Sequence, residues 1–363
     1  MTELFLQYAG DVPDKYAFKE DGRLTEYGPA QNDGTAPGAI FCGRAGDCVK
    51  AQEAAFIILG RNGKETRRGY LKTDKYCPGD RLPVQIIAPA DGEKPPRLTD
   101  NITLSGRVAV LKLSGRLQDF KVDISKKISG AERRAAVCAY GEKLSGIYSW
   151  YRSPESDPGI YVNGLIMRTA CEDAAEDEIL NDACKLKNML DRIRAAYADH
   201  VKNGSEGLLY APDAEERFGK DYPGIKIIRG DEGLFERERI DREYARLSGR
   251  KVLLPSGGNI IIDRTEALTA IDVNSASASA RTREELILNT NLEAAEEIAR
   301  QLRLRKITGI VLCDLINMDS DADKSTILHK FRTLFSQDPA KTEAFGFTKL
   351  GLLEISRKRS VIS

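Results

Sequence analysis

Two aspartates that end apolar segments are the residues best suited to chemistry in this sequence. Asp272 lies in the apolar stretch 268–273, and Asp314 directly follows the apolar stretch 310–313. If these stretches are neighbouring strands, the two carboxylates meet at one sheet edge and repel each other unless a cation or a proton lies between them. A hard divalent ion with oxygen ligands, Mg²⁺ first, suits such a pair. The alternative is that each aspartate forms a turn or caps a helix.

Asn274 is the third candidate for the same site. It follows Asp272 by two positions, so its side chain projects from the same face of a strand. Its amide could hold a carboxylate or a metal-bound water. The alternative is that Asn274 simply starts a loop.

The elements around these residues are predicted to be a hairpin, a helix and a strand. Asp263 and Arg264 break the β-branched run 259–262, and an apolar run resumes at 268–273, which indicates a hairpin. Asn291 is the expected N-cap of the helix, with Glu293 in its first turn, where the helix dipole favours a negative charge. Apolar residues then recur at helical spacing: Leu292, Ala295, Ala299 and Leu302. The run 310–313 is short and apolar, as in a buried strand.

At these residues the sequence resembles the ribonuclease E/G family of endoribonucleases. The resemblance is carried by LPSGG, IDRTEALTAIDVNSA, NTNLEAAEEIARQLRLR and GLLEISRKR. It implies that Asp272 and Asp314 bind a catalytic Mg²⁺ and that Asn274 assists them. Asn317 departs from the family, which commonly has a second aspartate there in a D-x-x-D run.

The resemblance also implies an α+β fold of several subdomains. An OB-fold β-barrel at 38–104 is inserted in an RNase H-like part, whose two segments are 1–37 and 191–250. A 5′-sensor region follows the barrel at 105–190, and a DNase I-like α/β catalytic subdomain occupies 251–363. Within 1–37, the residues themselves predict one strand, at 3–8, followed by a loop rich in Gly, Pro and Asp.

The segment 38–104 has the pattern of a small barrel in its own right. Five short β runs, at 39–42, 54–59, 69–71, 81–87 and 97–104, alternate with turn residues. Such barrels stack bases on exposed aromatic side chains beside basic groups. Candidates on the barrel are the aromatic residues Phe56 and Tyr70 and the basic residues Arg67, Arg68 and Lys94. Phe56 fits a core position equally well.

Two further sets of RNA contacts come from the same resemblance. Phe56, Tyr70 and Lys94 match its RNA-binding positions, and Lys341 falls where the family has a basic residue near the scissile or terminal phosphate. The pair Arg168-Thr169 follows a predicted strand, and a guanidinium beside a hydroxyl suits a terminal phosphate. The resemblance implies that this pair binds the 5′-monophosphate of RNA. Gly106 and Val110 match the backbone contributors to this 5′-phosphate-binding site.

Composition limits the other possibilities. Lys and Arg number 55, as do Asp and Glu, so an RNA-binding chain of this kind must segregate its basic groups. The seven cysteines include no C-x-x-C pair, so we expect buried free thiols and no zinc link, and a homo-oligomer would have to form without one. The only two histidines, His200 and His329, lie in no recognisable motif, which argues against a two-histidine ribonuclease.

The sequence therefore predicts a cytoplasmic, Mg²⁺-dependent endoribonuclease that acts on single-stranded RNA in RNA processing or decay. No apolar run approaches membrane-spanning length. By the resemblance, the enzyme prefers 5′-monophosphorylated ends and leaves 5′-phosphate and 3′-hydroxyl ends. The alternative is a catalytically weak or inactive family member that binds RNA without cleaving it.

Overall fold

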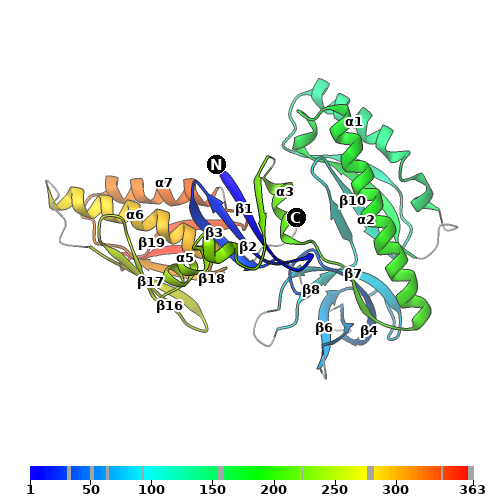
Figure 1. Cartoon of the computed structure of the whole chain (residues 1–363), viewed down its shortest axis with the longest axis horizontal. Coiled ribbons are helices and arrows are strands. Elements are labelled where there is room, and N and C mark those ends of the chain that lie inside the picture. The colour runs from blue at the N-terminus through cyan, green and yellow to red at the C-terminus, as the bar shows by residue number, and fades with distance from the viewer. Residues whose placement is uncertain are drawn as a thin grey trace. The chain divides into compact units, whose positions relative to one another are not determined.

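The computed structural model is a mixed α+β structure that divides into two compact units (Figure 1). It describes residues 1–30, 34–49, 53–62, 65–90, 94–153, 159–222, 224–275, 282–336 and 338–358. Residues 32–223 form the inserted unit, and residues 1–31 with 224–361 form the outer unit. Within the described ranges, no helix is both long and apolar enough to cross a membrane.

The inserted unit begins with a closed five-strand β-barrel, consistent with an OB-fold. Its strands are β4 (Ile40–Val49), β5 (Ala54–Asn62), β6 (Glu65–Lys72), β7 (Arg81–Ala88) and β8 (Arg97–Thr99). They follow the order β4-β5-β6-β8-β7, and β7 pairs with β4 to close the barrel. Strand β13 (Gly207–Tyr210) extends the sheet along β4. The barrel interior is filled by alternate residues of the strands, including Phe41, Ile57, Leu71, Val84 and Leu98.

The expected strand at 97–104 is two strands that belong to different sheets. The chain bends after β8, where the Thr99 hydroxyl accepts a hydrogen bond from the backbone N–H of Asn101. The second half, β9 (Ile102–Ser105), joins β10 (Ala109–Ser114), β12 (Tyr161–Met167) and β11 (Lys121–Ile124) in the order β11-β12-β10-β9. An apolar run alone could not reveal this change of sheet.

Two helices accompany the four-strand sheet of the inserted unit. They are α1 (Ala131–Ser145) and the long α2 (Glu176–Asn203), which lies along β10 in Figure 1. The apolar side of α2 is buried against the sheet: Ile179, Leu186, Leu190, Ile193 and Tyr197. The 3₁₀ turns η2 (Ser149–Arg152) and η4 (Thr169–Cys171) and helix α3 (Ala214–Asp221) complete the unit.

The outer unit uses both ends of the chain. Strands β1 (Thr2–Ala9), β2 (Val12–Glu20) and β3 (Arg23–Pro29) form a meander, and β14 (Lys226–Gly230) pairs with β1 in parallel. The prediction of a loop after the first strand was wrong. Gly10, Asp21 and Gly22 have positive φ angles and make tight turns, so the residues between them are strands. Helices α4 (Leu234–Arg237) and α5 (Ile240–Leu247) follow β14.

A six-strand sheet carries the candidate carboxylates. Its order is β15 (Lys251–Leu253), β16 (Asn259–Arg264), β17 (Leu268–Asn274), β18 (Gly309–Asp314), β20 (Leu353–Arg357) and β19 (Thr342–Phe347). Helices α6 (Arg283–Leu304) and α7 (Asp321–Phe335) pack against one face of this sheet (Figure 1). The predicted hairpin, β16 and β17, and the predicted strand β18 are confirmed, and β17 runs parallel to β18.

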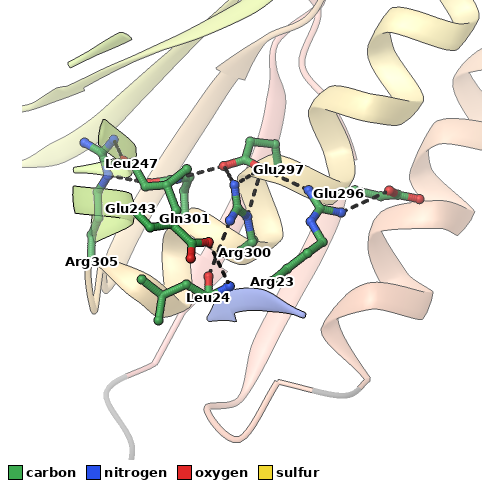
Figure 2. A network of polar contacts seen from close by, with 9 residues as sticks. All are labelled: Arg23, Leu24, Glu243, Leu247, Glu296, Glu297, Arg300, Gln301 and Arg305. Atoms are coloured by element: carbon green, nitrogen blue, oxygen red, sulfur yellow. Dashed lines mark hydrogen bonds and ion pairs between the residues drawn. The ribbon is translucent and has the colours of Figure 1, made fainter. Parts of the chain in front are cut away.

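A buried ionic network on α6 joins the two sheets of the outer unit (Figure 2). The Glu297 carboxylate, whose side chain is 3% exposed, accepts hydrogen bonds from Arg300, Gln301 and Arg23 of β3. Arg300 also donates to the carbonyl of Leu24 on β3. Because a buried charge is costly unless it is paired, this network fixes α6 against the N-terminal meander.

The seven cysteines are all free, but they are not all buried. The expectation of buried thiols is confirmed for Cys42, Cys171 and Cys313. It was wrong for three cysteines on the surface: Cys48, Cys77 and Cys184. The side chain of Cys313, on β18, packs in the core beside the candidate site. Burial raises the pKa of its thiol.

Candidate functional site

Asp272 and Asp314 lie side by side at the carboxyl ends of two parallel strands. They are register partners in the β17–β18 pair, and adjacent strands are about 4.8 Å apart. Both side chains are exposed, whereas the flanking Ile271, Val273 and Cys313 are buried on the helix-covered face. The two carboxylates therefore project from the open face of the sheet.

No counter-charge neutralises this carboxylate pair among the described residues, because neither aspartate forms an ion pair there. Two adjacent carboxylates disfavour each other's charge, and a divalent cation with oxygen ligands removes that penalty. The donor set of Asp272 and Asp314 therefore fits Mg²⁺. Within the same described ranges, no group of three or more His, Cys, Asp and Glu side chains is assembled as a metal site.

Asn274 orients one of the two carboxylates. Its Nδ2 donates a hydrogen bond of 2.7 Å to Oδ2 of Asp272. A close backbone contact fixes Asn274 in turn, because a Cβ on Gly258 would lie only 2.7 Å from the Asn274 carbonyl oxygen. The glycine of the LPSGG segment thus allows its loop to pack directly against the end of β17.

Asn291 of α6 clamps the backbone that follows Asp314. The Asn291 side chain is fully buried, its Nδ2 donates to the Ile316 carbonyl (2.8 Å), and its Oδ1 accepts from the Ile316 N–H (3.0 Å). The expected N-cap role of Asn291 was therefore wrong. Helix α6 begins at Arg283, and the hydroxyl of Thr282 caps it by accepting from the N–H of Glu285.

A second residue of α6 holds the loop on the other side of the carboxylate pair. The Glu293 carboxylate accepts a hydrogen bond of 3.0 Å from the backbone N–H of Ser256, in the LPSGG loop. The expected place of Glu293 in the first turn of the helix was wrong, because α6 begins ten residues earlier, at Arg283. One rigid helix thus positions the loops beside both carboxylates, which sequence spacing did not reveal. The one sequence feature that could have indicated this role is Asn291, a polar residue beside the apolar stripe of α6.

Replacing Asn291 by leucine is expected to lower the free energy of unfolding by about 1–3 kcal/mol, since the Ile316 N–H and C=O would lose their buried partners. Denaturant unfolding, followed by circular dichroism, measures the change. Thr290→Val is the matched control on the neighbouring position, because the Thr290 hydroxyl bonds only within its own helix, to the carbonyl of Leu286. Equal stability of Asn291→Leu and wild type would show that the clamp contributes nothing.

The four residues expected to bind a 5′-phosphate lie at one end of the sheet in the inserted unit. Arg168 follows β12, and its Nη1 donates to the Gly106 carbonyl at 2.9 Å. The Thr169 hydroxyl lies 3.3 Å from the hydroxyl of Ser125, just after β11. Val110 of β10 pairs with Ile166 of β12. The structure therefore brings these residues together and adds Ser125, which sequence reasoning missed.

Asp182 of α2 holds the loop that carries Gly106. Its carboxylate accepts hydrogen bonds from the backbone N–H groups of Arg107 (2.8 Å), Val108 (3.0 Å) and Ala109 (3.3 Å). A Cβ on Gly106 would lie 2.3 Å from Oδ2 of Asp182, so this close approach requires glycine. Asp182 thereby fixes the carbonyl that positions the guanidinium of Arg168.

Phe56 and Tyr70 form an aromatic pair on the outside of the barrel. They are register partners on β5 and β6, with ring centroids 6.0 Å apart and an interplanar angle of 71°. Both are half-buried, and neither belongs to the barrel core, so the core alternative for Phe56 does not apply. Exposed Arg68 lies on the same face of β6, and exposed Arg97 of β8 is the register partner of Tyr70.

One of the expected basic contacts, Arg67, lies elsewhere. Arg67 donates to the Gly34 carbonyl at 2.9 Å and stacks over the Phe41 ring at 5.2 Å. Successive side chains of a strand point to opposite faces, so Arg67 cannot share the face of Arg68. Arg67 therefore lies away from the aromatic pair, and its expected phosphate contact stays a prediction.

The two lysines expected to contact RNA lie in different surroundings. Lys94 is exposed and lies three residues before Arg97, the first residue of β8. Lys341 is exposed and pairs with Glu343 at 2.9 Å. It directly precedes β19, whose start lies beside the end of β20 and, across β20, beside the start of β18. Lys341 therefore lies at the end of the sheet away from Asp314.

The known proteins to which this chain is similar are ribonucleases. Residues 200–360 match the Ribonuclease E/G family. The chain is 33% identical to ribonuclease E of Synechocystis sp. and 33% identical to ribonuclease E of Nostoc sp., with 89% of the chain covered in each. It is 28% identical to ribonuclease G of Escherichia coli, again over 89% of the chain and over 73% of that protein.

The matches with the two ribonuclease E proteins cover 52% and 51% of their lengths, so the chain spans about half of those relatives. The match with the Escherichia coli ribonuclease G is longer in proportion. The match at residues 200–360 includes the sheet with its carboxylate pair. The chain therefore resembles the Ribonuclease E/G family, whose model its residues 200–360 match.

Proposed function

We propose that this chain is a Mg²⁺-dependent endoribonuclease of single-stranded RNA. The observation that carries the proposal is the pairing of Asp272 with Asp314 at the ends of parallel strands, with no ion pair to either among the described residues. The relatives named ribonuclease E and ribonuclease G support RNA as the substrate. RNA processing or decay is the corresponding cellular role.

The residues of the site have distinct roles in this proposal. Asp272 and Asp314 hold the cation, and Asn274 fixes the Asp272 carboxylate through its 2.7 Å hydrogen bond. Asn291 and Glu293 keep the neighbouring loops in place. Bound Mg²⁺ supplies charge stabilisation at the phosphate and a more acidic water. Attack by water, rather than by the RNA 2′-hydroxyl, would leave 5′-phosphate and 3′-hydroxyl ends.

The inserted unit would bind the strand. Bases stack on aromatic faces with little dependence on sequence, and the cations beside Phe56 and Tyr70 can contact phosphates. Arg168 and Thr169 would bind a 5′-monophosphate through charge-assisted hydrogen bonds. The preference for such ends would then come from a site separate from the carboxylate pair.

A circular single-stranded RNA tests the endonucleolytic activity directly, because it has no ends for an exonuclease. With Mg²⁺, the protein is expected to convert circles to linear RNA carrying 5′-phosphate and 3′-hydroxyl ends. Ligation assays specific for each end identify these products. Persistence of the circles, while linear RNA is degraded from its ends, would contradict the proposal.

Arg168→Ala is expected to lower the ratio of the cleavage rates of 5′-monophosphate and 5′-hydroxyl substrates about 10- to 100-fold. The reason is that the loss of a hydrogen bond to a charged group costs about 1.5–3 kcal/mol. Matched substrates that differ only at the 5′ end measure this ratio. Lys202→Ala is the charge-matched control, because Lys202 lies in the last turn of α2 and Arg168 precedes the first turn of that helix. An unchanged ratio in Arg168→Ala would remove the 5′-phosphate assignment.

A second candidate function is RNA binding with little or no cleavage. Asn317 favours it, because this exposed residue follows β18 where the family resemblance leads us to expect an aspartate. Tight binding of RNA without cleavage by wild type, with cleavage gained in Asn317→Asp, would identify this second function.

A further inference from the structure

The turn between β19 and β20 lies at the same sheet edge as the carboxylate pair. Phe347 at the end of β19 pairs with Leu353 at the start of β20, and Leu353 pairs with Cys313 of β18. Asp314 is the next residue along β18. A Cβ on Gly351 would lie 3.8 Å from Oδ1 of Asn317, so the turn also approaches the loop after Asp314.

Hydrogen bonds within the turn fix its conformation. The Thr348 N–H donates to the Leu352 carbonyl at 2.8 Å, and the Gly351 N–H donates to the Thr348 carbonyl at 3.0 Å. The Thr348 hydroxyl accepts from the N–H groups of Leu350 and Leu352, both at 3.1 Å. Gly351 has a φ of +86°, which suits glycine. The turn is therefore preorganised, with Lys349 and Leu350 at its tip.

Lys349 is an exposed cation on the turn that lies at the same end of the sheet as the two carboxylates. It forms no ion pair among the described residues, in contrast to other lysines of the outer unit: Lys226, Lys324, Lys330 and Lys341. Leu350 beside it is 85% exposed. Solvent-exposed apolar side chains are unremarkable singly, but here the leucine adjoins an available cation on a fixed turn.

We propose that Lys349 binds a backbone phosphate of the RNA strand that lies across Asp272 and Asp314, and that Leu350 contacts the adjoining ribose or base. Two negative carboxylates repel an approaching polyanion, so a site for RNA at this edge benefits from a cation outside the metal position. A lysine ammonium binds phosphate as a compact point charge and reads no sequence. The inference rests on the proposed function, which it deepens by naming a positioning residue for the substrate.

The test compares Lys349→Ala and Lys349→Arg with wild type. Lys226→Ala is the control, since this exposed lysine lies on the other sheet of the outer unit. Affinity for a 5′-hydroxyl single-stranded RNA is measured by fluorescence anisotropy in EDTA over a range of salt concentrations. Cleavage of the same RNA in Mg²⁺ gives kcat and KM separately.

Lys349→Ala is expected to weaken binding about 5- to 10-fold and to reduce the salt-dependence slope by about 0.7, which corresponds to one lost phosphate contact on a single strand. Lys349→Arg should retain most of the affinity, and Lys226→Ala should match wild type. An unchanged affinity and slope in Lys349→Ala would overturn the inference. Because binding is measured in EDTA, this result is independent of whether the wild type cleaves RNA.

Discussion

Asparagine in place of Asp272 or Asp314 is expected to reduce cleavage by at least about 10³-fold, because the cation contributes several kcal/mol of transition-state stabilisation. Each substitution removes one of the two negative charges that hold the cation. The double variant should lose little more than either single variant, since the two carboxylates act as a unit. Single-turnover cleavage at saturating Mg²⁺ measures the rates.

Measurements of RNA affinity and of stability distinguish the loss of catalysis from a loss of folding in these variants. Both variants should bind RNA as tightly as wild type, because the strand is held by other groups. Their stability without metal should be equal or higher, since each removes repulsion between adjacent carboxylates. Asp263→Asn is the matched control on β16, where the carboxylate pairs with Arg250. Wild-type cleavage rates in Asp272→Asn or Asp314→Asn would contradict the assignment of the pair.

Replacing both Phe56 and Tyr70 by alanine is expected to weaken RNA binding about 100-fold, as base stacking on an aromatic side chain contributes about 1–3 kcal/mol per base. The salt dependence of binding should stay the same, because no phosphate contact is removed. Anisotropy titrations of a labelled single-stranded RNA at several salt concentrations measure both quantities.

The barrel should tolerate this double substitution. Both rings lie outside the core cluster that fills the barrel, so circular dichroism should show the wild-type fold. Trp150→Ala is a suitable control, since Trp150 is a 61% exposed aromatic residue of the inserted unit outside the barrel strands. Wild-type affinity in the Phe56 and Tyr70 double variant would exclude the aromatic pair as a stacking surface.

Sequence patterns predicted the helices and strands in which buried residues recur at a regular spacing. The hairpin of β16 and β17 and the strand β18 each have one buried face, so apolar residues mark them directly. The barrel followed from short β runs with regular turns. The juxtaposition of Asp272 and Asp314 then needed only that β17 and β18 be adjacent and parallel.

The errors came from partners that are distant in sequence. Asn291 fits a cap by its short polar side chain, yet its amide is satisfied by Ile316, which no local pattern can show. Arg67 and Arg68 are adjacent in sequence, and only the register of β6 decides which one faces outward. The direction of β19 likewise decides that Lys341 lies at the end of the sheet away from Asp314. The positions of Lys349 and Asp182 become visible only when the strands and helices are assembled.

The most direct test of the account is cleavage of an internally labelled single-stranded RNA that carries a 5′-monophosphate. Wild-type protein would be assayed with Mg²⁺, with EDTA, and with Mg²⁺ restored in excess over EDTA. A metal-dependent site at Asp272 and Asp314 predicts internal cuts that disappear in EDTA and return with Mg²⁺. Cuts that persist in EDTA, or an RNA that stays bound and intact in Mg²⁺, would contradict the claim that Asp272 and Asp314 form a metal-dependent nuclease site.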